Sequence, residues 1–87
     1  MDNKWIYFIQ GQATGLIKIG QSAAPGARLD QMQTGSPDRL VILGVLKYSR
    51  NLEGELHSKF ADSRSHGEWY KPGPELLSFI KEFTYKY

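Results

Sequence analysis

Residues 40–46 read LVILGVL, a nearly continuous apolar run that is bounded by Asp38-Arg39 and by Lys47. A strand with one face in water alternates apolar and polar residues, whereas an unbroken apolar run fits a strand that is covered on both faces. We therefore interpret this run as the central strand of a sheet, with cover on each side.

Two shorter strands are expected before this run. Residues 4–9 (KWIYFI) and 16–20 (LIKIG) are rich in aromatic and β-branched residues, and the turn-rich segment QGQATG links them. This arrangement predicts a β-hairpin.

The alternation of side chains along a strand decides which residues of the hairpin share a face. Lys18 must point away from the two isoleucines that flank it. If the apolar residues of both strands face the core, then Tyr7 and Lys18 lie together on the opposite face. The core-facing set is then Ile6, Phe8, Ile17 and Ile19.

Three further segments show helical signals. Ser22 is a candidate cap for a helix that has Pro25 in its first turn and ends at Thr34-Gly35. Apolar residues recur at helical spacing after Asn51 and again after Pro74. They are Leu52, Leu56 and Phe60 in the first case and Leu76, Phe79, Ile80 and Phe83 in the second. The order of elements is therefore ββαβαα, an α/β fold with a small sheet.

The length of the chain, 87 residues, suits one small domain, and we expect residues 1–87 to form it. Cysteine is absent, so neither disulfides nor thiolate zinc ligation is available. A net charge of +2 permits a nucleic-acid partner without arguing strongly for one. The apolar run near the start is too short for a signal peptide or a membrane span, so we expect a cytoplasmic protein with no membrane partner.

Several familiar catalytic patterns are missing from the sequence. Gly20 stands alone where a phosphate-binding loop needs several glycines, the histidines lack metalloprotease spacing, and no G-x-S-x-G motif is present. Tyr7, Lys18 and Arg28 each also have a purely structural explanation: a half-buried strand tyrosine, an edge-strand lysine and an arginine that lies along a helix.

Glu53 is the more informative carboxylate of the second helix. Glu55 precedes Lys59 by four residues, a spacing that gives a helix-surface ion pair worth about 0.2 to 0.5 kcal/mol, whereas Glu53 precedes His57 at that spacing. The structural alternative for Glu53 is an interaction with the helix N-terminus, worth about 0.3 to 1 kcal/mol.

Taken together, these residues resemble the GIY-YIG nuclease superfamily. The resemblance is carried by Tyr7 in IYF, by IKIG, by Arg28, by the spacing E-x-x-L-H-x-x-F in residues 53–60, by Arg64, and by GEWY in residues 67–70. It is closest to the small phage and bacterial branch typified by the T5orf172 and meiotically up-regulated gene 113 domains, and it runs from about residue 5 to residue 80.

The resemblance implies a three-stranded, mainly antiparallel sheet flanked by helices, and cleavage of phosphodiester bonds with one divalent metal ion. By position, Tyr7 matches the tyrosine of the first motif, Arg28 the helix arginine, and Glu53 the metal-binding glutamate. His57 and the segment 67–69 match the closer branch. Lys18 stands where the second motif usually opens with tyrosine, and a cation there can hold a phosphate or lower the pKa of a nearby phenol.

These assignments predict a mechanism. Glu53 would bind Mg²⁺ or Mn²⁺, which are hard ions that prefer oxygen ligands. Tyr7 would accept a proton from the attacking water, its pKa lowered by Lys18, while Arg28 and Lys18 stabilise the charge on the phosphate. His57 is either a proton shuttle or a buried histidine packed beside Phe60.

Nucleic acid is the expected partner, and DNA is favoured over RNA. Two other functions stay open: a non-catalytic nucleic-acid-binding module on the same scaffold, and a protein-interaction adaptor. For Trp69 and Tyr70, the last residues of GEWY, we expect positions in the core rather than stacking on bases. Tyr70 stands where relatives often have phenylalanine. Glu68 is either paired with Arg64 or unassigned.

Overall fold

The computed structural model describes residues 3–87, so the first two residues of the predicted domain lie outside it. Five strands form one sheet in the order β3-β1-β2-β5-β4, and neighbouring strands are antiparallel. The elements along the chain are β1 (Trp5–Gly11), β2 (Ile17–Ser22), α1 (Pro25–Thr34), β3 (Leu40–Lys47), α2 (Arg50–Lys59), a short 3-10 helix η1 (Ala61–Ser63), β4 (Arg64–His66), β5 (Trp69–Tyr70) and α3 (Pro74–Phe83).

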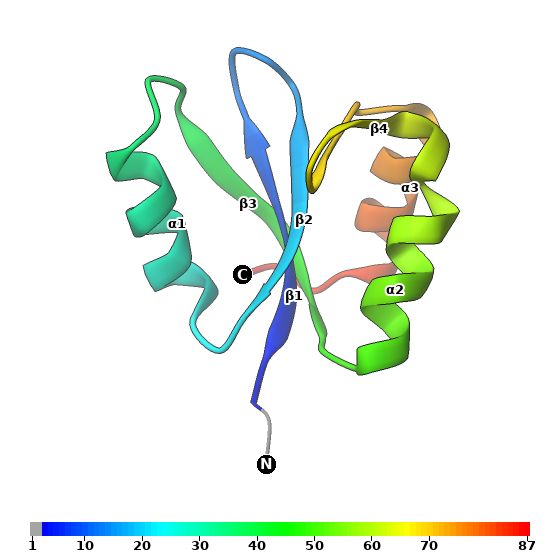
Figure 1. The fold of residues 1–87 in the computed structure, drawn as a ribbon. Helices are drawn as coiled ribbons and strands as arrows, with labels where there is room; N and C mark the ends of the chain where they lie inside the picture. Colours follow the sequence, from blue (N-terminus) through cyan, green and yellow to red (C-terminus); the bar gives the residue numbers. More distant parts are fainter. Residues whose placement is uncertain (1–2) are drawn as a thin grey trace.

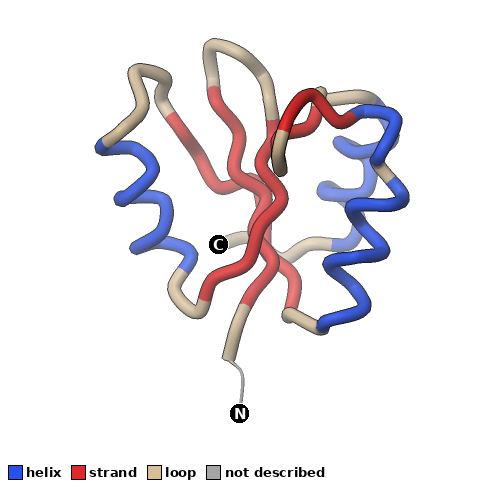
Figure 2. Tube along the Cα trace, in the orientation of Figure 1, coloured by secondary structure: helices blue, strands red, loops and turns tan. Residues whose placement is uncertain are grey.

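Helices cover both faces of the sheet. Figure 1 shows α1 on one side and α2 with α3 on the other, and Figure 2 shows the strands running between them. The face toward α2 and α3 buries Ile6, Phe8, Ile17 and Ile19 against Leu56, Phe60, Leu76 and Ile80. The face toward α1 buries Tyr7, Ile9, Leu40 and Val45 against Leu29 and Met32. The fold therefore has two apolar layers, one on each side of the strands.

The predicted hairpin forms with the predicted faces. Phe8 lies opposite Ile19 and Tyr7 lies opposite Gly20. Because directly opposite residues of antiparallel strands point to the same side, Tyr7 and Lys18 share the face toward α1. Lys18 is not on an edge strand, however, because it pairs with β1 on one side and with Trp69 of β5 on the other.

The sheet is larger than the three strands expected. The two additional strands follow α2: residues 61–66 form η1 and β4, and β4 then pairs with β5. Gly67, at a φ of +54°, makes the tight turn between these two strands. Strands of three and two residues are too short to carry a periodic apolar pattern, which is why the sequence did not reveal them.

The interpretation of residues 40–46 as the central strand is wrong, because β3 lies at one end of the sheet. The apolar run is still explained, since β3 supplies residues to the apolar layers on both of its faces. Its outer edge is partly covered by the C-terminal segment: the backbones of Val45 and Tyr85 exchange two hydrogen bonds of 2.9 Å. Beyond this bridge, the Tyr87 hydroxyl accepts a hydrogen bond from the Gly26 N–H at 2.9 Å, at the start of α1.

The helix ends are only partly as expected. Pro25 and Pro74 begin their helices, and the Ser49 hydroxyl caps α2 by accepting a hydrogen bond from the Leu52 N–H at 3.1 Å. Ser22 does not cap α1, because Ala24 occupies the cap position and the Ser22 hydroxyl accepts from the Ala24 N–H instead. None of the helices in residues 3–87 is long and apolar enough to cross a bilayer.

Candidate functional site

The outer edge of β2 has a partner over only part of its length. β5 pairs with Ile17 and Lys18, and the Glu68 carbonyl accepts a hydrogen bond from the Ile19 N–H at 3.1 Å. In the described part of the chain, no strand pairs with this edge at residues 20–22. Side chains from both faces of the sheet can therefore meet around it, and a hollow of about 740 Å³ lies there. Its lining includes Tyr7, Gln21, Arg28, Glu53, His57 and Glu68.

The Tyr7 phenol reaches this hollow by lying across Gly20. A Cβ atom built on Gly20 would be 2.5 Å from the Tyr7 hydroxyl oxygen and 2.6 Å from the ring carbon that bears it. Real Cβ atoms do not approach other atoms this closely, so a side chain at Gly20 would displace the phenol. The glycine that closes the IKIG motif is thus a requirement of the position of Tyr7.

Burial raises the pKa of the Tyr7 phenol above its ordinary value of 10.0, and the carboxylates of Glu68 and Glu53 raise it further. The Arg28 guanidinium opposes this by stabilising the phenolate. The net shift is upward, and the cation that acts on the phenol is Arg28; Lys18 is not among the groups that affect this pKa.

Glu53 and His57 lie one turn apart on α2 and face the hollow. The adjacent turns of α2 place Leu56 and Phe60 in the core, which fixes the rotation of the helix. The Gln21 side-chain amide on β2 donates a hydrogen bond of 3.1 Å to Glu53 Oε1. Glu53 is thus held between its own helix and the free part of β2, with its side chain 16% exposed.

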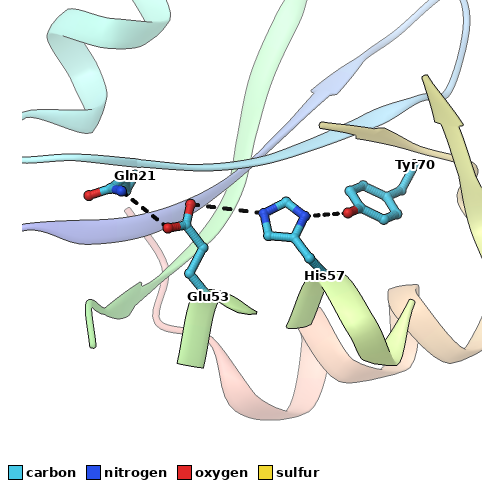
Figure 3. Close-up of polar contacts among 4 residues, drawn as sticks. All are labelled: Gln21, Glu53, His57 and Tyr70. Atoms are coloured by element: carbon cyan, nitrogen blue, oxygen red, sulfur yellow. Dashed lines mark hydrogen bonds and ion pairs between the residues drawn. The ribbon is translucent and has the colours of Figure 1, made fainter. Parts of the chain in front are cut away.

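His57 is not the buried histidine beside Phe60 that was one alternative, because its side chain is 27% exposed and lines the hollow. Its Nε2 lies 3.9 Å from Glu53 Oε2, and its Nδ1 is hydrogen-bonded to the Tyr70 hydroxyl. Figure 3 shows the resulting row of side chains, from Gln21 through Glu53 and His57 to Tyr70. Tyr70 itself is 1% exposed and belongs to the core, as expected.

Glu68 brings a second carboxylate to the same place. Its backbone is fixed to β2 through the bond from Ile19, and a donor atom of its side chain lies within 4.8 Å of donor atoms of both Glu53 and His57. No ion pair joins Glu68 to Arg64 in the part of the chain that the structure describes. Two carboxylates and an imidazole are suitable donors for a divalent metal ion, so the residues present fit the metal that the resemblance implies.

The structure brings together four of the five predicted site residues. Tyr7, Arg28, Glu53 and His57 line the hollow, although they come from β1, α1 and α2. Lys18 is not among its lining residues. It lies two positions before Gly20 on the same face of β2, a displacement of about 7 Å along the strand.

Three contributors were not assigned to the site from the sequence, although two of them belong to the GEWY motif: Gln21, Glu68 and the hydroxyl of Tyr70. The available signal for Glu68 was its place directly after Gly67, which is typical of a tight turn. The hydrogen bonds of Gln21 and Tyr70 depend on how α2 sits against the sheet. No spacing along the chain encodes that arrangement.

Comparison with known proteins agrees with this geometry. The family model described as the T5orf172 domain matches residues 4–83. No match was found among curated proteins or among solved structures. The model covers nearly the whole chain, including every residue of the candidate site, and the chain therefore belongs to the T5orf172 domain family, a branch of the GIY-YIG nuclease superfamily.

Proposed function

We propose that this protein is a divalent-metal-dependent endonuclease that hydrolyses phosphodiester bonds in nucleic acid, with DNA as its substrate. The observation that carries the proposal is the convergence of Tyr7, Arg28, Glu53 and His57 on one hollow at the free edge of β2. A phenol, a guanidinium, a carboxylate and an imidazole are the groups needed to move a proton, bind a phosphate and hold a metal.

Glu53 is the residue that would hold Mg²⁺ or Mn²⁺. When bound, such an ion neutralises charge on the phosphate and assists departure of the leaving oxygen. The bond from Gln21 orients the Glu53 carboxylate before any ligand arrives. Preorganisation of this kind avoids a reorganisation cost during the reaction.

Tyr7 is the proposed general base. Its pKa is raised in the protein alone, partly by the two nearby carboxylates, Glu53 and Glu68. Charge on these carboxylates is offset in the metal-bound state, and Arg28 then remains as the cation that favours the phenolate. The phenolate favoured in this way would be the form that accepts the proton of the attacking water.

Arg28 would bind the phosphate, because its planar guanidinium presents paired donors to phosphate oxygens. Lys18 lies further along the same face of β2. It would contact a phosphate of the nucleic acid next to the one that reacts, and so stabilise the charge of the substrate backbone. His57 would carry a proton between the hollow and solvent, since its ring is partly exposed.

A second function is favoured by one observation. Burial shifts the pKa of Tyr7 upward, whereas a tyrosine that acts as a base at neutral pH needs a downward shift. A protein that kept this fold but did not cleave its substrate would act as a nucleic-acid-binding module. Such binding would weaken with salt and would not depend on a metal.

The deciding experiment is cleavage of plasmid, linear and single-stranded DNA by purified protein, with Mn²⁺, with Mg²⁺ and with a chelator. The nuclease proposal expects nicked or linear product only with metal. It also expects Arg28→Ala and Glu53→Ala to lower the rate by about 10² to 10³ while the melting temperature stays nearly unchanged.

Glu55→Ala is the matched control for these variants. Glu55 lies on the same helix as Glu53 but is exposed and does not line the hollow, so its loss should leave the rate unchanged. Binding of DNA without product under every metal condition would establish the non-catalytic module instead. Full activity in the Glu53→Ala variant would remove that carboxylate from the mechanism.

A further inference from the structure

His57 and Glu68 face the same small volume as Glu53. The donor atoms of these three residues all lie within 4.8 Å of one another, and Glu53 Oε2 is 3.9 Å from His57 Nε2. That separation is too long for a hydrogen bond. It is shorter than the roughly 4.4 Å that can separate two ligands on opposite sides of one ion. The Glu68 carboxylate is exposed, so its side chain is free to adjust around an ion.

The hydrogen bond of His57 to Tyr70 leaves its Nε2 available to bind a metal. Its Nδ1 is hydrogen-bonded to the hydroxyl of Tyr70, which is 1% exposed and cannot move without disturbing the core. A hydroxyl can accept a hydrogen bond as well as donate one. When Nδ1–H donates to Tyr70, the proton is fixed on that nitrogen and the lone pair of Nε2 points toward Glu53. Metal-binding histidines are commonly held by such a bond from their other nitrogen.

Glu53 is oriented in the same way. Gln21 donates its amide N–H to Glu53 Oε1, which leaves Oε2 on the side of His57. The other end of that amide, Gln21 Oε1, is buried and has no hydrogen-bond partner among residues 3–87. A flipped amide would place this oxygen against a carboxylate that cannot donate, so the orientation is fixed by Glu53. The oxygen of this amide points away from Glu53 (Figure 3), so Gln21 orients the carboxylate without joining the three donors.

We propose that His57 and Glu68 complete, with Glu53, a mixed nitrogen–oxygen metal site that selects Mn²⁺ over Mg²⁺, and that the Tyr70 hydroxyl positions the His57 ring for this role. Mg²⁺ takes oxygen ligands and retains its waters, whereas transition ions accept imidazole readily. The inference rests on the proposed function for its site and deepens it by naming the ligand set. A ligated His57 has both ring nitrogens engaged, so in this arrangement it holds the metal in place of carrying a proton. It is tested by metal binding and not by turnover.

The main test is calorimetric titration of Mn²⁺ and Mg²⁺ into the wild type and into His57→Gln, Glu68→Gln and Tyr70→Phe. His57→Gln and Glu68→Gln should each weaken Mn²⁺ binding by about tenfold or more. Tyr70→Phe removes only a hydroxyl and should weaken it by about tenfold, the usual scale for a residue that supports a ligand. His57→Gln should also remove most of the preference for Mn²⁺ over Mg²⁺.

The chain offers matched controls. His66→Gln changes the other histidine, which is exposed on β4, and Glu55→Gln changes an exposed carboxylate of α2. Both should bind Mn²⁺ as the wild type does. An unchanged ratio of Mn²⁺ to Mg²⁺ affinity in His57→Gln overturns the inference, and so does a wild type that binds neither ion.

A measurement on the unaltered protein guards against variants that fail to fold. The sequence has two histidines, so their ¹⁵N resonances are readily assigned. With Zn²⁺ as a diamagnetic probe, the His57 Nε2 signal should shift as ligation begins while the His66 signals stay in place. Metal-dependent cleavage without a shift at His57 would overturn this ligand set and leave the proposed nuclease standing.

Discussion

The phenol of Tyr7 lies directly over Gly20, on the neighbouring strand, so that the free part of β2 carries the ring of a β1 residue in place of a side chain of its own. The two positions are therefore coupled. Any residue larger than glycine would move the group that we propose as the base.

Gly20→Ala tests this coupling. The added methyl group must displace the phenol, so we expect a loss of about 1 to 3 kcal/mol in the free energy of unfolding, measured by urea denaturation. We also expect loss of DNA cleavage. Gly35→Ala is the control: a Cβ there meets nothing within 4 Å, and its φ of −95° suits alanine. Equal stability of the two variants would show that Tyr7 has room to move.

The pKa of Tyr7 gives a dependence of stability on pH. Because burial raises this pKa in the folded state above 10.0, the folded protein holds the proton more tightly than the unfolded chain does. Its contribution is complete below about pH 10 and is lost as the pH rises further. Tyr7→Phe cannot ionise, so the alkaline fall in unfolding free energy should become shallower in that variant.

Tyr70 provides the comparison for that measurement, since burial raises its pKa as well. Tyr70→Phe should remove part of the same alkaline fall. If the wild type and both variants lose stability in parallel above pH 10, neither phenol is shielded as the structure indicates.

Lys18 and Arg28 should differ in kinetics because only Arg28 lines the hollow. For Arg28→Met we expect a lower kcat, since a contact to the reacting phosphate is lost. For Lys18→Met we expect a higher KM and a weaker dependence of binding on salt, with kcat nearly unchanged. A fall in kcat as large for Lys18→Met as for Arg28→Met would place the lysine at the reacting phosphate.

The hydrogen bond between the Tyr87 hydroxyl and the Gly26 N–H ties the end of the chain to the start of α1. Tyr87→Phe removes this bond, and because the site is exposed we expect a cost of only about 0.5 kcal/mol. Faster amide exchange at Gly26 is the more sensitive measurement. Tyr85→Phe is the control, since the hydrogen bonds of Tyr85 to β3 are made by its backbone and not by its hydroxyl. An unchanged rate of amide exchange at Gly26 would show that the Tyr87 hydroxyl does not protect this N–H.

The parts of the fold that follow from local patterns were predictable. Alternation in residues 17–20 gave the faces of the hairpin, and the spacing of Leu76 and Ile80 gave α3. The position of β3 in the sheet was not predictable, because an apolar run reports cover on the faces of a strand and not which strands lie beside it.

The same distinction applies to the site. Tyr7, Arg28 and Glu53 were found through the order and spacing of family motifs, which cover nearly the whole chain. Glu68 was noted as part of GEWY but not assigned to the site, because its approach to Glu53 depends on the bond from the Ile19 N–H to the Glu68 carbonyl. Backbone pairing between segments that are distant in the chain cannot be predicted from the residues of a single sequence.

The hollow draws on both apolar layers of the molecule: Tyr7 and Arg28 come from the α1 side, and Glu53 and His57 from the α2 side (Figure 1). Neither apolar layer alone supplies all the side chains of the hollow. A partly folded chain, with one layer docked and the other loose, would hold at most half of the reactive groups. For the nuclease that we propose, chemical competence would thereby be coupled to completion of folding, and the chain would not cleave nucleic acid until both sides have closed.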